Sequence, residues 1–189
     1  DINNINQVLL DNPVVIKIAS EENNIDLIKQ SAYYVDEDKK GPLLRYLIKH
    51  NNMQQVLVFT SSTYKADNVA DKLRKNGIDA SAIHSKKSQS ARTHALRNFK
   101  NGSIRVLVAT DLLARGIDIE FLPVVINYEL PRSPKDYIHR IGRTGRADTP
   151  GDAITIVTPE DEHHFKIIQK KRKKWVDRVA CDNLDLKHY

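Results

Sequence analysis

Short, mostly apolar stretches that alternate with helical patterns are the feature of this sequence that most restricts its fold. Five of them are rich in β-branched or small apolar residues and lack polar alternation: residues 55–59 (QVLVF), 80–83 (ASAI), 105–109 (RVLVA), 124–128 (VVINY) and 153–157 (AITIV). Strands buried on both faces of a parallel sheet have this composition. Residues 32–35 form a weaker sixth stretch. The sequence therefore predicts an α/β fold with a mainly parallel central sheet flanked by helices.

Four segments between these stretches carry helix signals. Residues 64–76 place apolar side chains on one helical face and end at Gly77, which suits the left-handed backbone past a helix terminus. Residues 88–99 begin with a capping serine and are followed by Asn-Gly. Two further helices are predicted to start at Ser133 and Thr158, because each hydroxyl precedes a proline at the first helical position.

Composition divides the chain into one core domain and two flanking segments. Residues 1–30 are rich in Asn and Asp around one apolar patch at 14–16, and we expect them to form a connecting arm. Residues 31–168 hold the strand and helix patterns of a single domain. Residues 169–189 begin with QKKRKK, which predicts that the last helix continues into a loosely packed extension. Because the chain begins with Asp1 and not with Met, we expect it to be part of a longer protein.

The charge balance and the single cysteine limit the partners and the compartment. The chain has 30 Lys and Arg against 24 Asp and Glu, a formal net charge of +6 and a pI near 9.3, which favours a polyanion such as nucleic acid. Cys181 has no second cysteine to pair with, and the sequence contains neither a signal segment nor an apolar run long enough to cross a bilayer. We therefore expect a soluble, cytoplasmic protein with no membrane partner. We also expect it to be a monomer.

Residues 139–146 (HRIGRTGR) are the most informative motif, with three arginines three positions apart and two glycines between them. Guanidinium groups match phosphate oxygens two at a time, and glycine lets a backbone approach a polyanion closely. A solvated basic loop is the alternative for this motif taken alone. The glycines predict that the preceding helix ends near Ile141, so that a turn presents the later arginines.

Polar segments also follow several predicted strands, where ligands bind in open α/β sheets. Residues 60–63 (TSST) could cap the next helix or donate to a phosphate, and capping is the favoured role. Residues 84–92 (HSKKSQSAR) carry three cations near a helix start. Residues 110–118 (TDLLARGID) place a hydroxyl, two carboxylates, an arginine and a glycine together. Because Asp118 lies between two isoleucines, we expect its carboxylate to have a specific partner, with a backbone amide or Arg115 as candidates.

Other kinds of site find no support in the sequence. His163 and His164 are adjacent and so point to different helix faces, and no spacing completes a set of metal ligands. No nucleophile elbow and no Cys-His signature is present. None of the seven glycines begins a phosphate-binding loop that ends in Lys-Ser or Lys-Thr. The chain therefore has arginines suited to phosphate but lacks this loop. We expect it to supply only half of a nucleotide-binding site.

Four motifs resemble those of a known family. Residues 56–62 (VLVFTSS), 109–119 (ATDLLARGIDI), 125–131 (VINYELP) and 139–146 (HRIGRTGR) are similar, in order and spacing, to motifs IV, V, Va and VI of the DEAD-box RNA helicases. The resemblance covers residues 32–168 and implies the second, carboxyl-terminal domain, which is a RecA-like three-layer sandwich. The phosphate loop, the Asp-Glu-Ala-Asp tetrapeptide and the Ser-Ala-Thr motif of the family's first domain are absent from this sequence.

The resemblance implies roles for individual residues. Arg143 and Arg146 match arginine fingers that reach the γ-phosphate of ATP, where the charge of phosphoryl transfer develops. Asp118 would hold the ribose hydroxyls, with Gly116 allowing close approach, and an N-terminal RecA-like domain would hold most of the ATP and its Mg²⁺. The residues implied in coupling between the two domains are Arg115, His139 and Arg140, and those implied in RNA backbone contacts are Thr110, Gln89 and Arg92.

One departure from the family pattern follows residue 83. Where the family usually has His-Gly-Asp, this chain has His84-Ser85-Lys86 and then Lys87. Lysines in place of an acid predict stronger nonspecific attraction to RNA phosphates and a steeper salt dependence.

The resemblance implies an ATP-driven enzyme that separates RNA strands locally. The present chain would supply half of each site of this enzyme and would be inactive alone. Two rival hypotheses are a noncatalytic RNA-binding adaptor, which would have no reason to combine Asp118, Arg143 and Arg146, and a DNA-directed translocase. The basic run at residues 169–174 is either an additional RNA contact or a solvated helix face, and the solvated face is slightly favoured.

Overall fold

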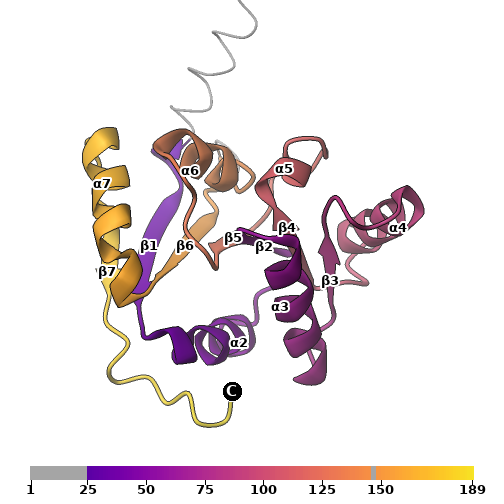
Figure 1. Ribbon diagram of the computed structural model, residues 1–189, viewed down its shortest axis with the longest axis horizontal. Helices are drawn as coiled ribbons and strands as arrows, with labels where there is room; N and C mark the ends of the chain where they lie inside the picture. Colours follow the sequence, from indigo (N-terminus) through magenta and orange to yellow (C-terminus); the bar gives the residue numbers. More distant parts are fainter. Residues whose placement is uncertain (1–24, 146–147) are drawn as a thin grey trace, which may run out of the picture.

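The computed structural model describes residues 25–145 and 148–189. Within them a seven-stranded, wholly parallel sheet of order β3-β4-β2-β5-β6-β1-β7 forms the middle layer (Figure 1). The strands are β1 (Lys29–Tyr34), β2 (Val56–Thr60), β3 (Ala80–Ile83), β4 (Val106–Thr110), β5 (Val124–Asn127), β6 (Asp152–Val157) and β7 (Asp177–Val179). The α/β fold with a mainly parallel sheet is confirmed.

Helices cover both faces of this sheet. One face packs against α2 (Lys40–His50) and α3 (Thr63–Lys75), and the other packs against α4 (Gln89–Lys100), α5 (Asp111–Ala114), α6 (Pro134–Ile141) and α7 (Glu162–Arg172). Two short 3-10 turns, η1 (Glu37–Lys39) and η2 (Pro159–Asp161), lead into α2 and α7. The result is the three-layer sandwich that the sequence predicted.

Central strands are apolar on both faces because each face meets a helical layer. Val56 and Val58 of β2 belong to the cluster under α2 and α3, whereas Leu57 and Phe59 belong to the cluster under α4 and α5. All four side chains are at most 1% exposed. This two-sided burial explains why the strand sequences show no polar alternation.

Most of the local signals for helix ends behave as predicted. The exception is Thr158, which precedes the 3-10 turn η2 and whose hydroxyl donates to the Asp161 carboxylate in place of accepting from a backbone amide. The hydroxyls of Ser62, Ser88 and Ser133 each accept a hydrogen bond from the amide three residues on, at 3.1 Å. Gly77 has a φ of 81°, and α6 ends at Ile141. The favoured capping role of the TSST segment is therefore confirmed for its third residue.

The sequence analysis did not predict the short elements η1 and α5, and it missed two that shape the domain. The first is α2, which buries four aliphatic residues, Leu43, Leu44, Leu47 and Ile48. The second is β7, which pairs in parallel with β1 at the sheet edge, beyond a helix that ends at Arg172. Leu184 and Leu186 are partly buried against the core, so the segment after α7 contacts the domain through β7 and a few apolar side chains.

The amino-terminal arm is described only from residue 25 onward. Ile25 and Ile28 are 2% and 7% exposed and belong to the core cluster under α6 and α7. The predicted apolar patch at residues 14–16 lies outside the described residues. None of the helices formed by the described residues has the length and hydrophobicity that crossing a membrane requires.

Replacing Phe165 by alanine tests the packing of α7. Its ring is fully buried, 6.4 Å from the ring of Tyr137. We expect Phe165→Ala to lower the free energy of unfolding by about 3–5 kcal/mol, because a large buried side chain leaves a cavity. Urea denaturation measures the loss, and Lys166→Ala, on the exposed side of the same helix, is the matched control. Equal stability of the two variants would contradict this packing.

Candidate functional site

The turn after α6 is fastened to the segment that enters β5. The amide of Leu122 donates to the carbonyl of Arg143 at 3.0 Å, and the amide of Gly145 donates to the carbonyl of Leu122 at 2.9 Å. The Thr144 hydroxyl, in a side chain that is almost fully buried, donates to the same carbonyl at 2.5 Å. The HRIGRTGR turn and the loop after α5 therefore form one continuous surface.

The half-buried Arg143 strengthens this junction. Its guanidinium donates to the carbonyls of Ala114 (2.6 Å), Ile117 (3.0 Å) and Ile119 (3.2 Å). The last two carbonyls flank Asp118, so the arginine predicted as a finger and the carboxylate predicted as a ribose contact lie on adjoining segments. Arg146, the second predicted finger, lies outside the described residues, and its role stays a prediction.

Asp118 differs from the sequence prediction. The side chain is exposed, and among the described residues it forms neither a hydrogen bond nor an ion pair. The expectation of a specific partner within the domain was wrong, because a carboxylate in water needs none. The candidate partner Arg115 instead forms an ion pair with Asp136 near the start of α6. Asp118 is thus open to a ligand from outside the domain.

A cavity of about 450 Å³ adjoins Asp118. Phe121 and Lys100 are among its other lining residues. Phe121 is 58% exposed and has a φ of 62°, an uncommon backbone conformation for a bulky residue. The sequence analysis did not single out Phe121, although an aromatic residue three positions after the aspartate of motif V was a visible signal.

Arg140 is the buried centre of the site, with 1% of its side chain exposed. Its Nε and one terminal nitrogen donate to the two carboxylate oxygens of Asp111 at 2.6 and 2.7 Å. The other terminal nitrogen donates to Asn127 Oδ1 at 3.2 Å and to the carbonyl of Glu129 at 2.6 Å. The guanidinium also lies 5.1 Å from the centre of the Phe59 ring. Arg140 thus ties α6 to the carboxyl ends of β2, β4 and β5.

Because Arg140 faces inward, it would not contact a second domain directly. It would affect such a domain only through the positions of α6 and of the strand ends to which it binds. The ion pair of Arg115 and Asp136 lies nearer to solvent, with 56% of the arginine side chain exposed. His139 is half-buried, and its Nδ1 is buried without a hydrogen-bond partner among the described residues. The coupling roles of these three residues stay predictions.

Replacing Arg140 tests this arrangement. We expect Arg140→Ala to lower the free energy of unfolding by about 3–5 kcal/mol, because Asp111 and the Glu129 carbonyl then lose their buried cationic partner. The double variant with Asp111→Ala should lose clearly less than the sum of the two single variants, because the two residues interact directly. Chemical denaturation of the four proteins measures the coupling, and strict additivity would contradict it.

The glycines of the HRIGRTGR motif serve the packing of the domain itself. A Cβ on Gly145, where φ is 72°, would lie 2.6 Å from the amide nitrogen of Gly151, and one on Gly142 would lie 3.0 Å from the carbonyl of Ile138. The interpretation that they admit a polyanion is therefore not needed for these two positions. Gly116 differs, because its nearest neighbour, the Leu113 carbonyl, would be at an ordinary 3.7 Å. Nothing described within the domain requires glycine there.

The segment that departs from the family pattern is held by a buried histidine. His84 is 1% exposed, with Nε2 2.9 Å from Asp67 Oδ1 and Nδ1 accepting from the amide of Lys86 at 3.2 Å. Lys87 also pairs with Asp67, at 3.1 Å. Of the two lysines at this position, Lys86 is the exposed one whose ammonium group pairs with no carboxylate in the described part of the chain.

The other predicted RNA contacts surround this segment. Gln89 is exposed at the start of α4, and Arg92 is half-buried one turn later. The Nε of Arg92 is buried without a partner among the described residues. Thr110 ends the neighbouring strand β4 and is 9% exposed. The structure therefore places the start of α4 and the end of β4 along one side of the sheet (Figure 1).

The Asp67 cluster predicts a pH dependence of stability. Burial raises the pKa of Asp67, but hydrogen bonds from His84 and Lys87 outweigh it and hold the pKa below its usual value. A carboxyl with a lowered folded-state pKa stabilises the fold above its unfolded pKa of about 3.9, and this stabilisation is lost as the pH falls further. The melting temperatures of wild type and Asp67→Asn should therefore differ most above about pH 5 and converge below about pH 3. A pH-independent difference would contradict this.

Residues 39–148 match the family described as "Helicase conserved C-terminal domain", and the fold is the RecA-like fold of such domains. In the described residues no group of three or more His, Cys, Asp or Glu side chains is placed to hold a metal ion.

Three relatives specify the kind of helicase domain. The chain is 36% identical over 184 residues to the DEAD-box ATP-dependent RNA helicase CshA of Bacillus subtilis, covering 97% of this chain and 37% of that protein. It is 32% identical to the C-terminal domain of the DEAD-box protein Dbp5, with a TM-score of 0.78 and coverage of 87% and 96%. Dbp5 of S. cerevisiae bound to RNA and ADP BeF3 gives 32% identity, a TM-score of 0.76 and coverage of 84% and 43%. The chain belongs to the DEAD-box RNA helicase family, as its C-terminal domain.

Proposed function

We propose that this chain is the C-terminal half of an ATP-dependent RNA helicase and completes an ATP site and an RNA groove begun by an N-terminal RecA-like domain. The chain spans 37–38% of the length of the first CshA relatives, which leaves room for such a domain. The observation that carries the proposal is the contact of Arg143 with the two carbonyls that flank Asp118. This contact supports one continuous surface on which a cation and a carboxylate can bind the same nucleotide.

The proposed chemistry follows from the charges on this surface. As phosphoryl transfer proceeds, negative charge grows on the γ-phosphate oxygens, and an arginine supplied from outside the phosphate cradle contributes about 10³–10⁵-fold in rate. Arg143 would exchange neutral carbonyl acceptors for charged phosphate oxygens, which form stronger hydrogen bonds. Arg146 would supply the second guanidinium, and the N-terminal domain would hold Mg²⁺ and most of the ATP.

Asp118 would bind the ribose. Its exposed carboxylate can accept hydrogen bonds from both ribose hydroxyls, and Gly116 leaves the backbone beside it open to close approach. Arg115, His139 and Arg140 would transmit closure between nucleotide and RNA.

The RNA half-site would follow the sheet edge from Thr110 to the start of α4. Lys86, Gln89 and Arg92 offer two cations and an amide, which suit the sugar-phosphate backbone and carry no base specificity. The related Dbp5 was solved with RNA bound, which supports RNA as the polyanion. ATP and RNA together would close the two domains and bend the RNA so that a duplex cannot stay paired. We propose that the intact protein acts as a cytoplasmic monomer.

Arginine 143 gives the direct test in the intact, two-domain protein. We expect Arg143→Ala to reduce RNA-stimulated ATP hydrolysis by about 10³-fold or more while RNA affinity changes little, because the finger acts on the transition state. Steady-state hydrolysis and RNA titration measure the two effects. The 189-residue chain alone should hydrolyse no ATP and unwind no duplex.

Two controls make this experiment decisive. Arg97→Ala removes an exposed guanidinium near the end of α4 and should leave hydrolysis unchanged. Because Arg143 also holds backbone carbonyls, the melting temperature of Arg143→Ala is compared with that of Arg143→Lys, which keeps the charge but not the bidentate fork. A folded Arg143→Ala protein that hydrolyses ATP normally would refute the finger.

A further inference from the structure

The only tryptophan of the chain, Trp175, lies in the turn that follows α7, and its side chain faces solvent. Trp175 is 63% exposed, although a large aromatic ring gains from burial. The turn is fixed by Gln169, a side chain that is 5% exposed and whose Oε1 accepts from the amide of Val176 at 2.8 Å. The carbonyl of Gln169 accepts from the amide of Lys174 at 3.2 Å. Since both neighbours of Trp175 are tied to one buried residue, the ring is presented to solvent by a defined backbone.

The same end of α7 is strongly basic. Residues 163–176 contain no acidic residue. Arg172 is turned inward, with its guanidinium 4.7 Å from the centre of the Tyr137 ring, and Lys174 pairs with Asp26. At the carboxyl end of α7, after Gln169, the other exposed lysines are Lys170, Lys171 and Lys173, and they pair with no carboxylate in the described part of the chain. Exposed lysines on a helix are usually solvated. Here they precede an exposed tryptophan whose two neighbours are fixed by hydrogen bonds, and this combination points to a ligand.

An aromatic ring among lysines matches the chemistry of single-stranded nucleic acid. Lysines neutralise the phosphates, and a base of any identity can stack on the ring. An apolar protein partner would instead favour a larger apolar patch with fewer charges at its centre. RNA is the appropriate strand because the chain belongs to a family of RNA helicases.

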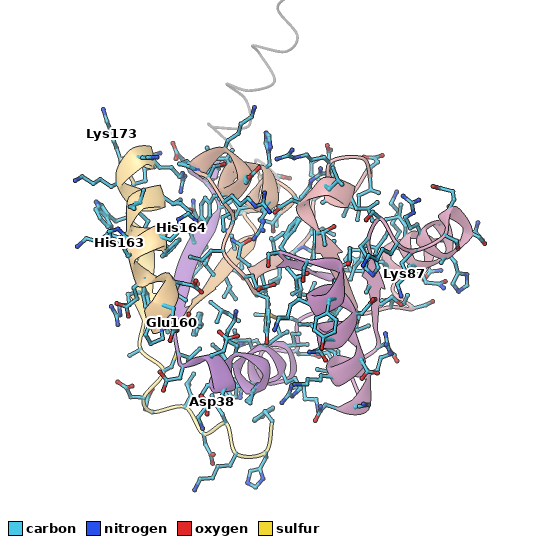
Figure 2. All side chains as sticks on the ribbon, in the orientation of Figure 1. Asp38, Lys87, Glu160, His163, His164 and Lys173 are labelled. Carbon is cyan, nitrogen blue, oxygen red and sulfur yellow. The ribbon has the colours of Figure 1, made fainter. Side chains whose placement is uncertain are left out.

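We propose that Trp175 and the lysines at the end of α7 form a second contact for single-stranded RNA, separate from the half-site at Lys86. This proposal rests on the proposed function only in taking RNA as the ligand. Figure 2 shows Lys173 extending outward at the end of α7, with Lys87 on the opposite side of the domain. A strand must therefore be long enough to pass around the domain before it contacts both sites, so the second contact would hold RNA that flanks the unwound segment.

Because the chain has one tryptophan, its fluorescence reports on this site alone. Titrating an unlabelled single-stranded uridine oligonucleotide of about 20 nucleotides, longer than a typical single-strand site of about 4–16 nucleotides, should quench Trp175 emission. The quenching should weaken as salt is added. In parallel, fluorescence anisotropy of a labelled copy of the same RNA measures total binding.

Variants separate stacking from charge. Trp175→Ala should weaken binding of the long RNA by about 5- to 100-fold, whereas Trp175→Phe should keep most of the affinity because it still stacks. Lys173 has a φ of 57°, which asparagine also adopts, so Lys173→Asn removes a charge without straining the turn. It should lower the salt slope by about 0.7, while the charge-matched control Lys75→Asn on α3 should leave the slope unchanged.

The outcomes distinguish this inference from the proposed function. RNA binding without a change in Trp175 emission, and with unchanged affinity in folded Trp175→Ala, would overturn the second site and leave the first intact. Failure of the chain to bind RNA at all would count against both. Quenching by polyglutamate as strong as that by RNA would overturn the assignment to nucleic acid. Arg92→Ala should weaken the binding of RNA of about 5 nucleotides as well as that of long RNA. Trp175→Ala should weaken only the binding of long RNA.

Discussion

The buried guanidinium of Arg140 is the interaction on which the organisation of the site depends. A charge with 1% exposure is tolerated only when it is fully paired, and here Asp111, Asn127 and the Glu129 carbonyl supply the acceptors. These acceptors lie at the carboxyl ends of two strands, β4 and β5, which flank β2 in the sheet. The requirement to satisfy one cation therefore fixes the start of the loop after β4 and the helix before the HRIGRTGR turn relative to each other.

This anchor leaves the neighbouring charged groups available. Arg143 is held by carbonyl oxygens, which are weaker partners than phosphate, and Asp118 has no partner among the described residues. Arg115 pairs with Asp136 near the surface. The motif thus divides its arginines by environment: the deeply buried one builds the site, and a half-buried one is placed where it can exchange partners. The same residue type serves structure or chemistry according to burial.

The sequence analysis explained the glycines of the HRIGRTGR motif by close approach of a polyanion, whereas the structure explains them by close approach of backbone within the domain. Glycine is required at position 145, where φ is 72° and a Cβ would lie 2.6 Å from the amide nitrogen of Gly151. At position 142 a Cβ would lie 3.0 Å from the Ile138 carbonyl, a tight approach that favours glycine. Position 116 has no such neighbour. The sequence assigns all three glycines to a ligand. The neighbour of Gly145, residue 151, is visible only in the fold.

The sequence by itself determined the layered α/β fold, the helix caps at Ser88 and Ser133, and the end of α6, because these depend on local periodicity and local hydrogen bonds. It also directed attention to the residues just after each strand, and Asp111 and Glu129 do meet there around Arg140. Arg143 and Asp118 instead meet beside Leu122, ahead of β5, which the strand pattern did not indicate. Only the tertiary structure decided which side chains are paired: Arg115 with Asp136, Arg140 with Asp111, and Asp118 with nothing described in the domain. It also decided that β7 closes the sheet edge and that Gln169 turns Trp175 outward. Such pairings join residues far apart in the chain, and their energies depend on burial, which a linear pattern does not contain.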